Sequence, residues 1–94
     1  MNSISISDFN KLKNVNVIDI RSIEKFNNNH IEGAINIPIN LLISNPSKYL
    51  IKMDKYYIYC QRGIQSQKAC LILQKQGYNV VNIQGGYEAW ILNK

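Results

Sequence analysis

Residues 60–66, Cys-Gln-Arg-Gly-Ile-Gln-Ser, form the segment of this chain best suited to covalent chemistry. They lie between a run typical of a strand and a run typical of a helix. The backbone N–H groups of such a loop can turn inward as an anion-binding nest, and a helix that begins at Ser66 adds its positive end. Both effects favour a thiolate over a thiol, so the sequence predicts that Cys60 is a nucleophile.

The residues after Cys60 are expected to form a substrate-binding loop around its sulfur. Gly63 supplies the backbone freedom that a tight ring requires and leaves space beside the sulfur. A structural interpretation stays open, because strand, cysteine, loop, glycine and helix also follow one another in proteins without thiol chemistry. The candidate site comprises the nucleophile Cys60 and the loop residues Gln61, Arg62, Gly63, Ile64, Gln65 and Ser66.

Alternating strand and helix patterns surround this segment. Strands are expected at residues 15–20, 34–37, 56–59 and 79–83. Helices are expected after the capping residues Ser5 and Ser22, as short turns within 41–51, from Ser66 to Gly77, and after Gly86. Alternation of this kind predicts an α/β fold with a largely parallel sheet.

Length and composition indicate one globular domain over residues 1–94. The chain is 46% hydrophobic and 18% charged, which is typical of a folded domain rather than a disordered one. The N-terminus lacks the basic and apolar regions of a secretion signal, and no apolar run approaches the roughly 20 residues of a membrane span. We therefore expect a cytoplasmic protein without a membrane partner.

The charged and metal-binding residue types narrow the function further. The net charge of +5 is spread over scattered lysines, so small anions or acidic partners are favoured over nucleic acid. Two cysteines do not make a disulfide framework, and one histidine with two separated cysteines lacks the spacing of a zinc site. The chain is rich in Asn, Ile and Lys and has only two arginines, which suggests an AT-rich bacterial genome.

Three ordered motifs resemble those of the rhodanese-like domain family along nearly the whole chain. The first is Asp-Ile-Arg at 19–21 with His-Ile-Glu-Gly-Ala-Ile-Asn-Ile-Pro at 30–38. The second is Tyr-Ile-Tyr-Cys at 57–60 with Gly63 and Ser66, and the third is Gly-Gly-Tyr-Glu-Ala-Trp at 85–90. The resemblance implies a three-layer sandwich, with a central, mostly parallel sheet of about five strands and helices on both faces.

The resemblance also implies a persulfide mechanism that needs no cofactor. The Cys60 thiolate attacks the outer sulfur of a donor such as thiosulfate, and cyanide, a thiol or another protein then accepts that sulfur. The six residues 60–65 before the expected helix match the loop of the family's sulfurtransferases, whereas relatives that hydrolyse phosphate esters have one residue more. The alternative is a non-enzymatic module of the same fold that carries sulfur or binds proteins, with weak turnover.

Gln65 departs from the family pattern, because many single-domain relatives place there an arginine that helps to hold an anionic donor. Arg62 lies in the same loop and could supply that charge. It could equally be a solvated loop arginine, and the sequence leaves both interpretations open.

Three residues outside the loop are expected to support it. Asp19 and Arg21 end a predicted strand, and the resemblance favours an internal ion pair that fixes the neighbouring loops. The resemblance also implies that His30 braces the turn before Gly33 rather than acting as a base. Cys70 lies in an apolar helical run, so we expect a buried, unreactive thiol.

Overall fold

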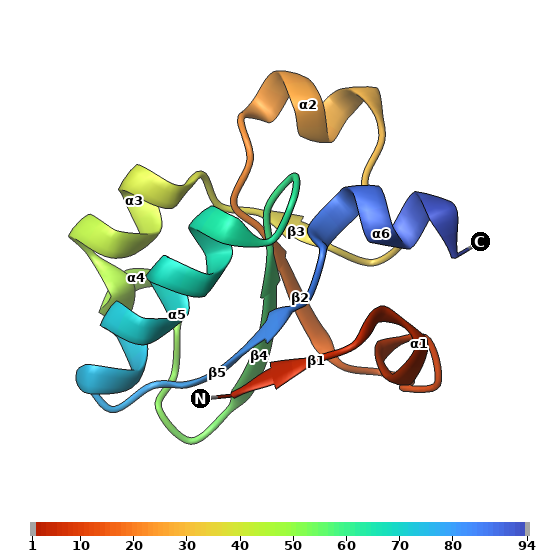
Figure 1. Cartoon of the computed structure of the whole chain (residues 1–94). Coiled ribbons are helices and arrows are strands. Elements are labelled where there is room, and N and C mark those ends of the chain that lie inside the picture. Colours follow the sequence, from red (N-terminus) through yellow and green to blue (C-terminus); the bar gives the residue numbers. More distant parts are fainter. Residues whose placement is uncertain (1, 94) are drawn as a thin grey trace.

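Five parallel strands form the centre of the fold (Figure 1). The computed structural model describes residues 2–93. The strands are β1 (Ser3–Ile4), β2 (Asn16–Asp19), β3 (Ile35–Asn36), β4 (Lys55–Tyr59) and β5 (Asn79–Ile83), and their order in the sheet is β1-β5-β4-β2-β3. Every adjacent pair is parallel. The α/β architecture expected from the alternating patterns is thus confirmed.

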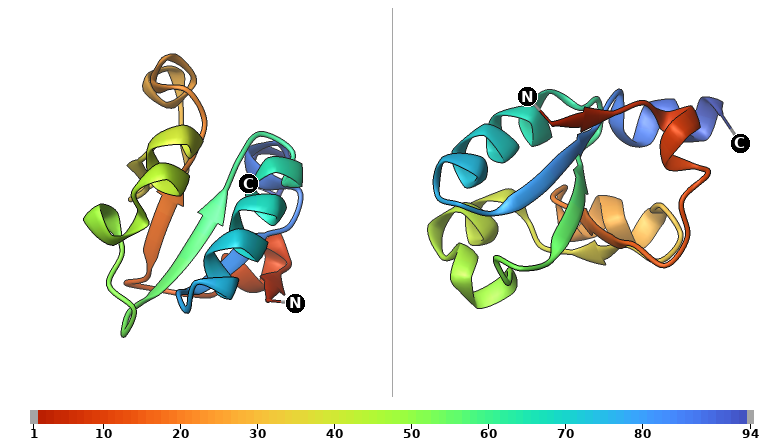
Figure 2. Two further views of the ribbon diagram at one scale, coloured as in Figure 1. Left: turned by 90° about the vertical axis from the view of Figure 1, so that its left-hand side faces the viewer. Right: turned by 90° about the horizontal axis from the view of Figure 1, so that it is seen from below.

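Helices cover both faces of the sheet (Figure 2). On one face lie α3 (Ile39–Ser44), α4 (Pro46–Tyr49) and α5 (Ile64–Lys75), which pack on strand residues such as Ile58 and Val80. On the other face lie α1 (Ile6–Phe9) and α6 (Gly86–Leu92), which pack on Tyr57 and Val81. Successive strand residues alternate between the faces, as the β pleat requires. The three-layer arrangement is therefore confirmed.

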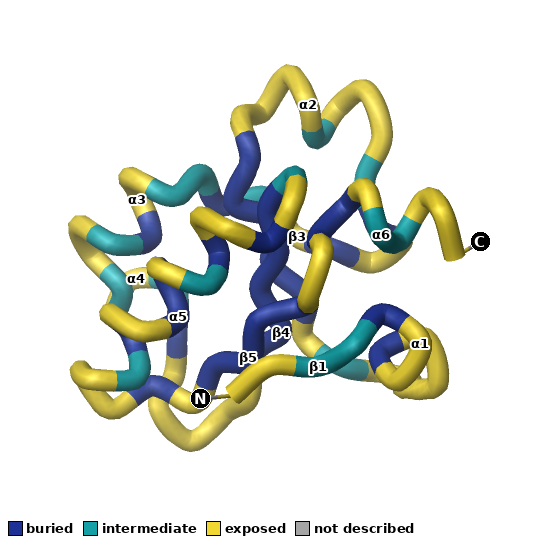
Figure 3. The backbone as a smooth tube through the Cα atoms, in the orientation of Figure 1, coloured by how far each residue is buried: buried dark blue, intermediate teal, exposed yellow. Residues whose placement is uncertain are grey.

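The strands are the most buried part of the chain, as the dark tube at the centre of Figure 3 shows. The remaining helix, α2 (Ile23–Asn28), has no fully buried residue and lies beyond the carboxyl end of β2 (Figure 1). Its partly buried Phe26 packs against the cluster under α1 and α6. Within residues 2–93, no helix is both long and apolar enough to cross a membrane.

Several local predictions are confirmed by hydrogen bonds. Ser5 Oγ accepts the Asp8 N–H at 3.1 Å and Ser22 Oγ accepts the Lys25 N–H at 3.3 Å, so both serines cap helices. The strand at 79–83 has the predicted bounds. The strands expected at 15–20 and 34–37 are shorter, and β1 was not predicted, because a two-residue edge strand has no periodicity to detect.

The predicted start of the central helix at Ser66 is wrong. Helix α5 begins at Ile64, and its N-cap is Gly63 with φ of 89°. The left-handed region at this position is one that glycine enters at little cost, so the helix begins two residues before the expected start at Ser66. Ser66 consequently lies in the first turn of α5, and its side chain is free to face the cysteine.

Candidate functional site

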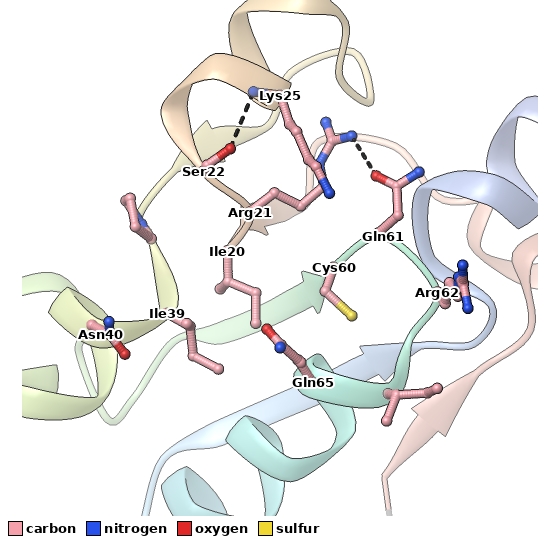
Figure 4. A pocket seen from close by; sticks show the side chains of 12 residues that line it. Ile20, Arg21, Ser22, Lys25, Ile39, Asn40, Cys60, Gln61, Arg62 and Gln65 are labelled. Carbon is pink, nitrogen blue, oxygen red and sulfur yellow. Dashed lines mark hydrogen bonds between the residues drawn. The ribbon is translucent and has the colours of Figure 1, made fainter.

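Cys60 follows β4 directly, and its sulfur is held by the first turn of α5 (Figure 4). The Sγ atom accepts the Gly63 N–H at 3.1 Å and the Ser66 N–H at 3.3 Å. The first N–H groups of a helix have no partner within the helix and carry its positive end. The sulfur therefore occupies a nest of N–H donors, as the sequence predicted, although the donors come from α5 itself as well as from the loop.

A buried polar pair lies behind the sulfur. The Cys60 thiol donates to Ser66 Oγ at 3.3 Å, and the Ser66 hydroxyl donates to Asn82 Oδ1 at 2.5 Å. Asn82 Nδ2 lies 3.4 Å from the carbonyl oxygen of Gly63, so the same amide also holds the loop. Ser66 is 0% and Asn82 4% exposed. Sequence reasoning missed Asn82, for which the signal was a polar side chain between the apolar residues Val81 and Ile83 of β5.

Helix α6 supports the loop from the opposite side. The Tyr87 N–H donates to the Cys60 carbonyl at 2.9 Å, and the Glu88 N–H donates to the Gln61 carbonyl at 3.1 Å. This close approach needs glycine, because a Cβ at Gly86 would overlap the Cys60 carbonyl oxygen. A Cβ at Gly63 would lie 2.8 Å from the backbone nitrogen of residue 85. The glycine pair at the start of α6 and the glycine of the loop thus fit against each other.

Asp19 and Arg21 form the buried ion pair that was expected of them. Arg21 Nη2 lies 2.8 Å from Asp19 Oδ2, and the Tyr59 hydroxyl donates to the same oxygen at 2.6 Å. Arg21 Nη1 donates to Gln61 Oε1 at 3.1 Å and Nη2 donates to the Asn29 carbonyl at 2.7 Å. The pair therefore connects the end of β2 to the loop that begins at Cys60 and to the segment that follows α2.

Burial and contact with Asp19 shift the pKa values of Arg21 and Tyr59. Burial alone lowers the pKa of Arg21, but the hydrogen bonds and charge of Asp19 outweigh it, so the pKa is raised. Burial raises the pKa of Tyr59, and its hydrogen bond to Asp19 raises it further. Arg21 therefore stays charged and Tyr59 stays protonated at neutral pH.

A pocket with a volume of about 700 Å³ opens beside Cys60 (Figure 4). Four of the predicted loop residues line it with Cys60, namely Gln61, Arg62, Ile64 and Gln65, and so does Arg21. Gly63 and Ser66 contact the sulfur without lining the pocket. Asp19 lies beneath it, fully buried. The structure thus brings together the predicted nucleophile and all six predicted loop residues.

His30 lies outside this pocket. Its ring stacks on Phe26 with a centroid distance of 3.8 Å, and Nδ1 lies 2.9 Å from the Phe26 carbonyl oxygen. These contacts tie the segment before Gly33 to α2, in keeping with a bracing role.

The charged residues that line the pocket are all cations. Its lining includes the cations Arg21, Lys25 and Arg62 and no carboxylate. Arg21 is paired with Asp19, and Arg62 Nε lies 3.5 Å from a Glu88 carboxylate oxygen with both side chains largely exposed. The sequence reasoning missed Lys25, which could have been noticed as a cation one helical turn after Arg21. It also missed the apolar lining residues Ile20, Pro38 and Ile39.

The second cysteine, Cys70, is buried and does not line the pocket. Burial raises the pKa of Cys70 to about 12, and the charge of Cys60 adds to the shift. Cys70 is 1% exposed and packs in the apolar cluster under α5. Among residues 2–93, no group of three or more His, Cys, Asp or Glu side chains is arranged to hold a metal ion.

Fold and site together define a parallel α/β protein with one cysteine held in an N–H nest at the carboxyl edge of the sheet. The sequence model of the rhodanese-like domain matches residues 5–93. The chain therefore belongs to the rhodanese-like domain family, as its three motifs led us to expect.

Individual relatives show how far the likeness extends. The chain is 37% identical over 82 residues to thiosulfate sulfurtransferase GlpE of Shewanella oneidensis, covering 83% of this chain and 77% of the relative. It is 32% identical over 79 residues to the putative sulfur carrier protein YrkF of Bacillus subtilis, covering 83% of this chain. Two of its curated relatives are considerably longer, since the chain spans 59% of one and 42% of YrkF.

Solved structures agree with the fold. The crystal structure of SSP1007 from Staphylococcus saprophyticus has a TM-score of 0.88 to this chain at 30% identity. The match covers 96% of this chain and 93% of that one. The arrangement of the whole sheet and of its helices is therefore shared.

Proposed function

We propose that the protein is a sulfurtransferase that moves a sulfane sulfur through a persulfide on Cys60. The observation that carries this proposal is the pair of N–H donors, from Gly63 and Ser66, aimed at the Cys60 sulfur at 3.1 and 3.3 Å. Fixed donors of this kind stabilise negative charge without reorganisation. The name of the relative GlpE, a thiosulfate sulfurtransferase, supports the same reaction.

The first step loads the cysteine. The Cys60 thiolate attacks the outer sulfur of thiosulfate or of a persulfide donor, and a new S–S bond forms. The original S–S bond of the donor breaks, and its electron pair leaves with sulfite or with the donor thiolate. The product on the protein is the anion Cys60–S–S⁻, which the same nest of N–H groups stabilises.

The second step unloads the cysteine. A thiophilic nucleophile, such as cyanide, a small thiol or a protein thiol, attacks the outer sulfur of the persulfide. The bond to Cys60 breaks and its electron pair returns to Sγ, so the thiolate is regenerated. The pocket beside Cys60 gives both reactants access to the same atom.

A second candidate function is a sulfur carrier or protein-binding module with weak turnover. The uncharged Gln65 favours it, because the pocket lacks an arginine at that position to hold a free anionic donor. The relative YrkF is named as a putative sulfur carrier protein. A carrier would acquire the persulfide but return only about one sulfur per protein, whereas the enzyme would form many equivalents of thiocyanate from thiosulfate and cyanide.

Intact mass spectrometry tests the proposal directly. Protein mixed with thiosulfate, or with a small organic persulfide, should gain about 32 Da, the mass of one sulfur atom. Cys60→Ser should abolish this gain. Cys70→Ser is the matched control and should retain it, because Cys70 is buried and protonated. An unchanged mass with every donor, or a loss that follows Cys70 instead of Cys60, would refute the mechanism.

We also propose that the protein works in the cytoplasm. Both cysteines are free thiols in the structure, and Cys60 needs its free thiol for the proposed reaction. Reducing compartments maintain that state. Fractionation of cells with an antibody to this chain tests the location, and recovery outside the cytoplasm would contradict it.

A further inference from the structure

The pocket beside Cys60 contains one cation without a charged partner. Arg21 uses Nε, Nη1 and Nη2 to hold Asp19, Gln61 and the Asn29 carbonyl. Arg62 lies beside Glu88. No carboxylate among residues 2–93 is paired with the Lys25 ammonium group, and the pocket lining itself contains no acidic residue.

Lys25 reaches the pocket from above. It lies in α2, and Figure 4 shows its side chain extending from that helix toward the end of β4 where Cys60 lies. Its backbone N–H is bound by Ser22, so the position of the residue on the helix is fixed while the side chain remains exposed. A substitution of this side chain therefore removes a charge from the pocket without disturbing the core.

The opposite part of the pocket is mainly apolar, with Asn40 and Gln65 as its polar residues. Ile20, Pro38 and Ile39 come from the end of β2 and the start of α3, and Ile64 is 58% exposed at the start of α5. A small inorganic dianion makes no use of such a wall, whereas methylene groups gain free energy by contacting it. The volume of about 700 Å³ lies in the range, roughly 300–1,000 Å³, of pockets that hold organic ligands.

We propose that this pocket accepts a small organic thiol bearing a carboxylate, with the carbon chain on the isoleucine wall and the carboxylate on Lys25. The inference rests on the proposed function and specifies its acceptor. The acceptor thiolate attacks the outer sulfur of the Cys60 persulfide and a new S–S bond forms. The bond to Cys60 breaks with its electron pair on Sγ, which yields the Cys60 thiolate and the persulfide of the acceptor without any external oxidant.

Alkylation of Cys60 measures the carboxylate preference without any sulfur transfer. Iodoacetate and iodoacetamide are of similar size and differ by one charge. The rate of Cys60 alkylation by iodoacetate, divided by the rate with iodoacetamide, therefore reports the local preference for a carboxylate. In a Cys70→Ser background, Lys25→Glu should lower this ratio by roughly threefold to tenfold and Lys25→Gln by roughly threefold, as expected for an exposed charge pair. The difference should shrink in 1 M salt.

Lys13→Gln is the matched control, because Lys13 is an exposed lysine that does not line the pocket. It removes the same charge from the protein and should leave the ratio unchanged. A ratio that Lys25→Glu does not alter, or that Lys13→Gln lowers as much as Lys25→Gln does, would overturn the proposal.

The acceptors themselves give the second measurement. Persulfide-loaded protein is mixed with 3-mercaptopropionate, 2-mercaptoethanol or cysteamine, and the loss of the added sulfur is followed by mass. Lys25→Glu should shift the preference from 3-mercaptopropionate toward cysteamine by roughly tenfold relative to the persulfide-loaded protein that retains Lys25. The intrinsic nucleophilicity of each thiol cancels, because the same thiols are compared in both proteins.

The two measurements separate this inference from the proposed function. A persulfide that forms and discharges with no dependence on residue 25 would overturn the inference alone. Failure of Cys60 to acquire sulfur, together with an alkylation ratio that depends on Lys25, would refute the sulfurtransferase and leave the carboxylate pocket supported.

Discussion

Asn82 Oδ1 lies 2.5 Å from Ser66 Oγ, and this contact joins the hydroxyl beside the candidate nucleophile to the middle of the sheet. Because Ser66 gives its proton to Asn82, its oxygen faces the Cys60 sulfur as an acceptor. That arrangement suits a neutral thiol. A thiolate or a persulfide anion is stabilised by a donated hydrogen bond, which Ser66 can supply when its O–H rotates from Asn82 Oδ1 toward Sγ.

The amide of Asn82 is thus expected to affect the reactivity of Cys60, because it can both accept and donate a hydrogen bond. Asn82→Asp replaces it with a carboxylate that only accepts and adds a negative charge near Sγ, both of which disfavour the thiolate. We expect the rate of Cys60 alkylation by iodoacetamide at pH 7 to fall by roughly threefold to tenfold.

The matched control for this change is Asn79→Asp, an exposed position at the other end of β5. It adds the same charge to the same strand and should leave the rate of Cys60 alkylation unchanged. If Asn82→Asp does not change the rate of Cys60 alkylation, Asn82 only supports the fold.

Gln65→Arg should improve the use of thiosulfate. Gln65 lines the pocket without a charge, and an arginine there could bind the sulfonate oxygens with two N–H groups. We expect KM for thiosulfate to fall by roughly threefold to tenfold with a smaller effect on kcat. Gln76→Arg adds the same charge at the far end of α5 and serves as the control. An equal response to both substitutions would attribute the effect to overall charge.

Asp19→Ala should destabilise the protein strongly. The substitution leaves the Arg21 guanidinium buried without its counter-ion and removes the acceptor of the Tyr59 hydroxyl. We expect the free energy of unfolding in urea to decrease by about 3–5 kcal/mol. Asp8→Asn, which removes the exposed contact with Lys11 at 3.6 Å, should change it little. Similar losses from both variants would contradict the importance of the buried pair.

Alkaline pH should unfold the protein partly through Cys70. Burial raises its pKa to about 12, so the folded state keeps a proton that the unfolded thiol releases near its ordinary pKa of about 8.5. The unfolded state then binds fewer protons, and the free energy of unfolding decreases as the pH rises through this interval. Cys70→Ala should flatten that decrease between about pH 9 and 11. Parallel pH profiles for the two proteins would contradict the expectation.

Local sequence signals predicted most of the elements because their causes are local. The bounds of β5 follow from a short run rich in Val and Ile, and the starts of α1 and α2 follow from serines whose hydroxyls bind N–H groups three residues later. The start of α5 could not be predicted in the same way. Gly63 ends the loop because it fits against the backbone of residues 85 and 86, which lie more than 20 positions away in the chain.

Sequence by itself determined that Cys60 follows a strand and precedes a glycine and a helix, which is sufficient to predict a nest of N–H groups around its sulfur. Only the tertiary structure decided which side chains surround that nest. Asn82 reaches Ser66 because β5 lies beside β4, and Lys25 reaches the pocket because α2 lies beyond the carboxyl end of β2. Parallel strands join through crossovers, so contacts between them have no fixed spacing that a sequence pattern could reveal.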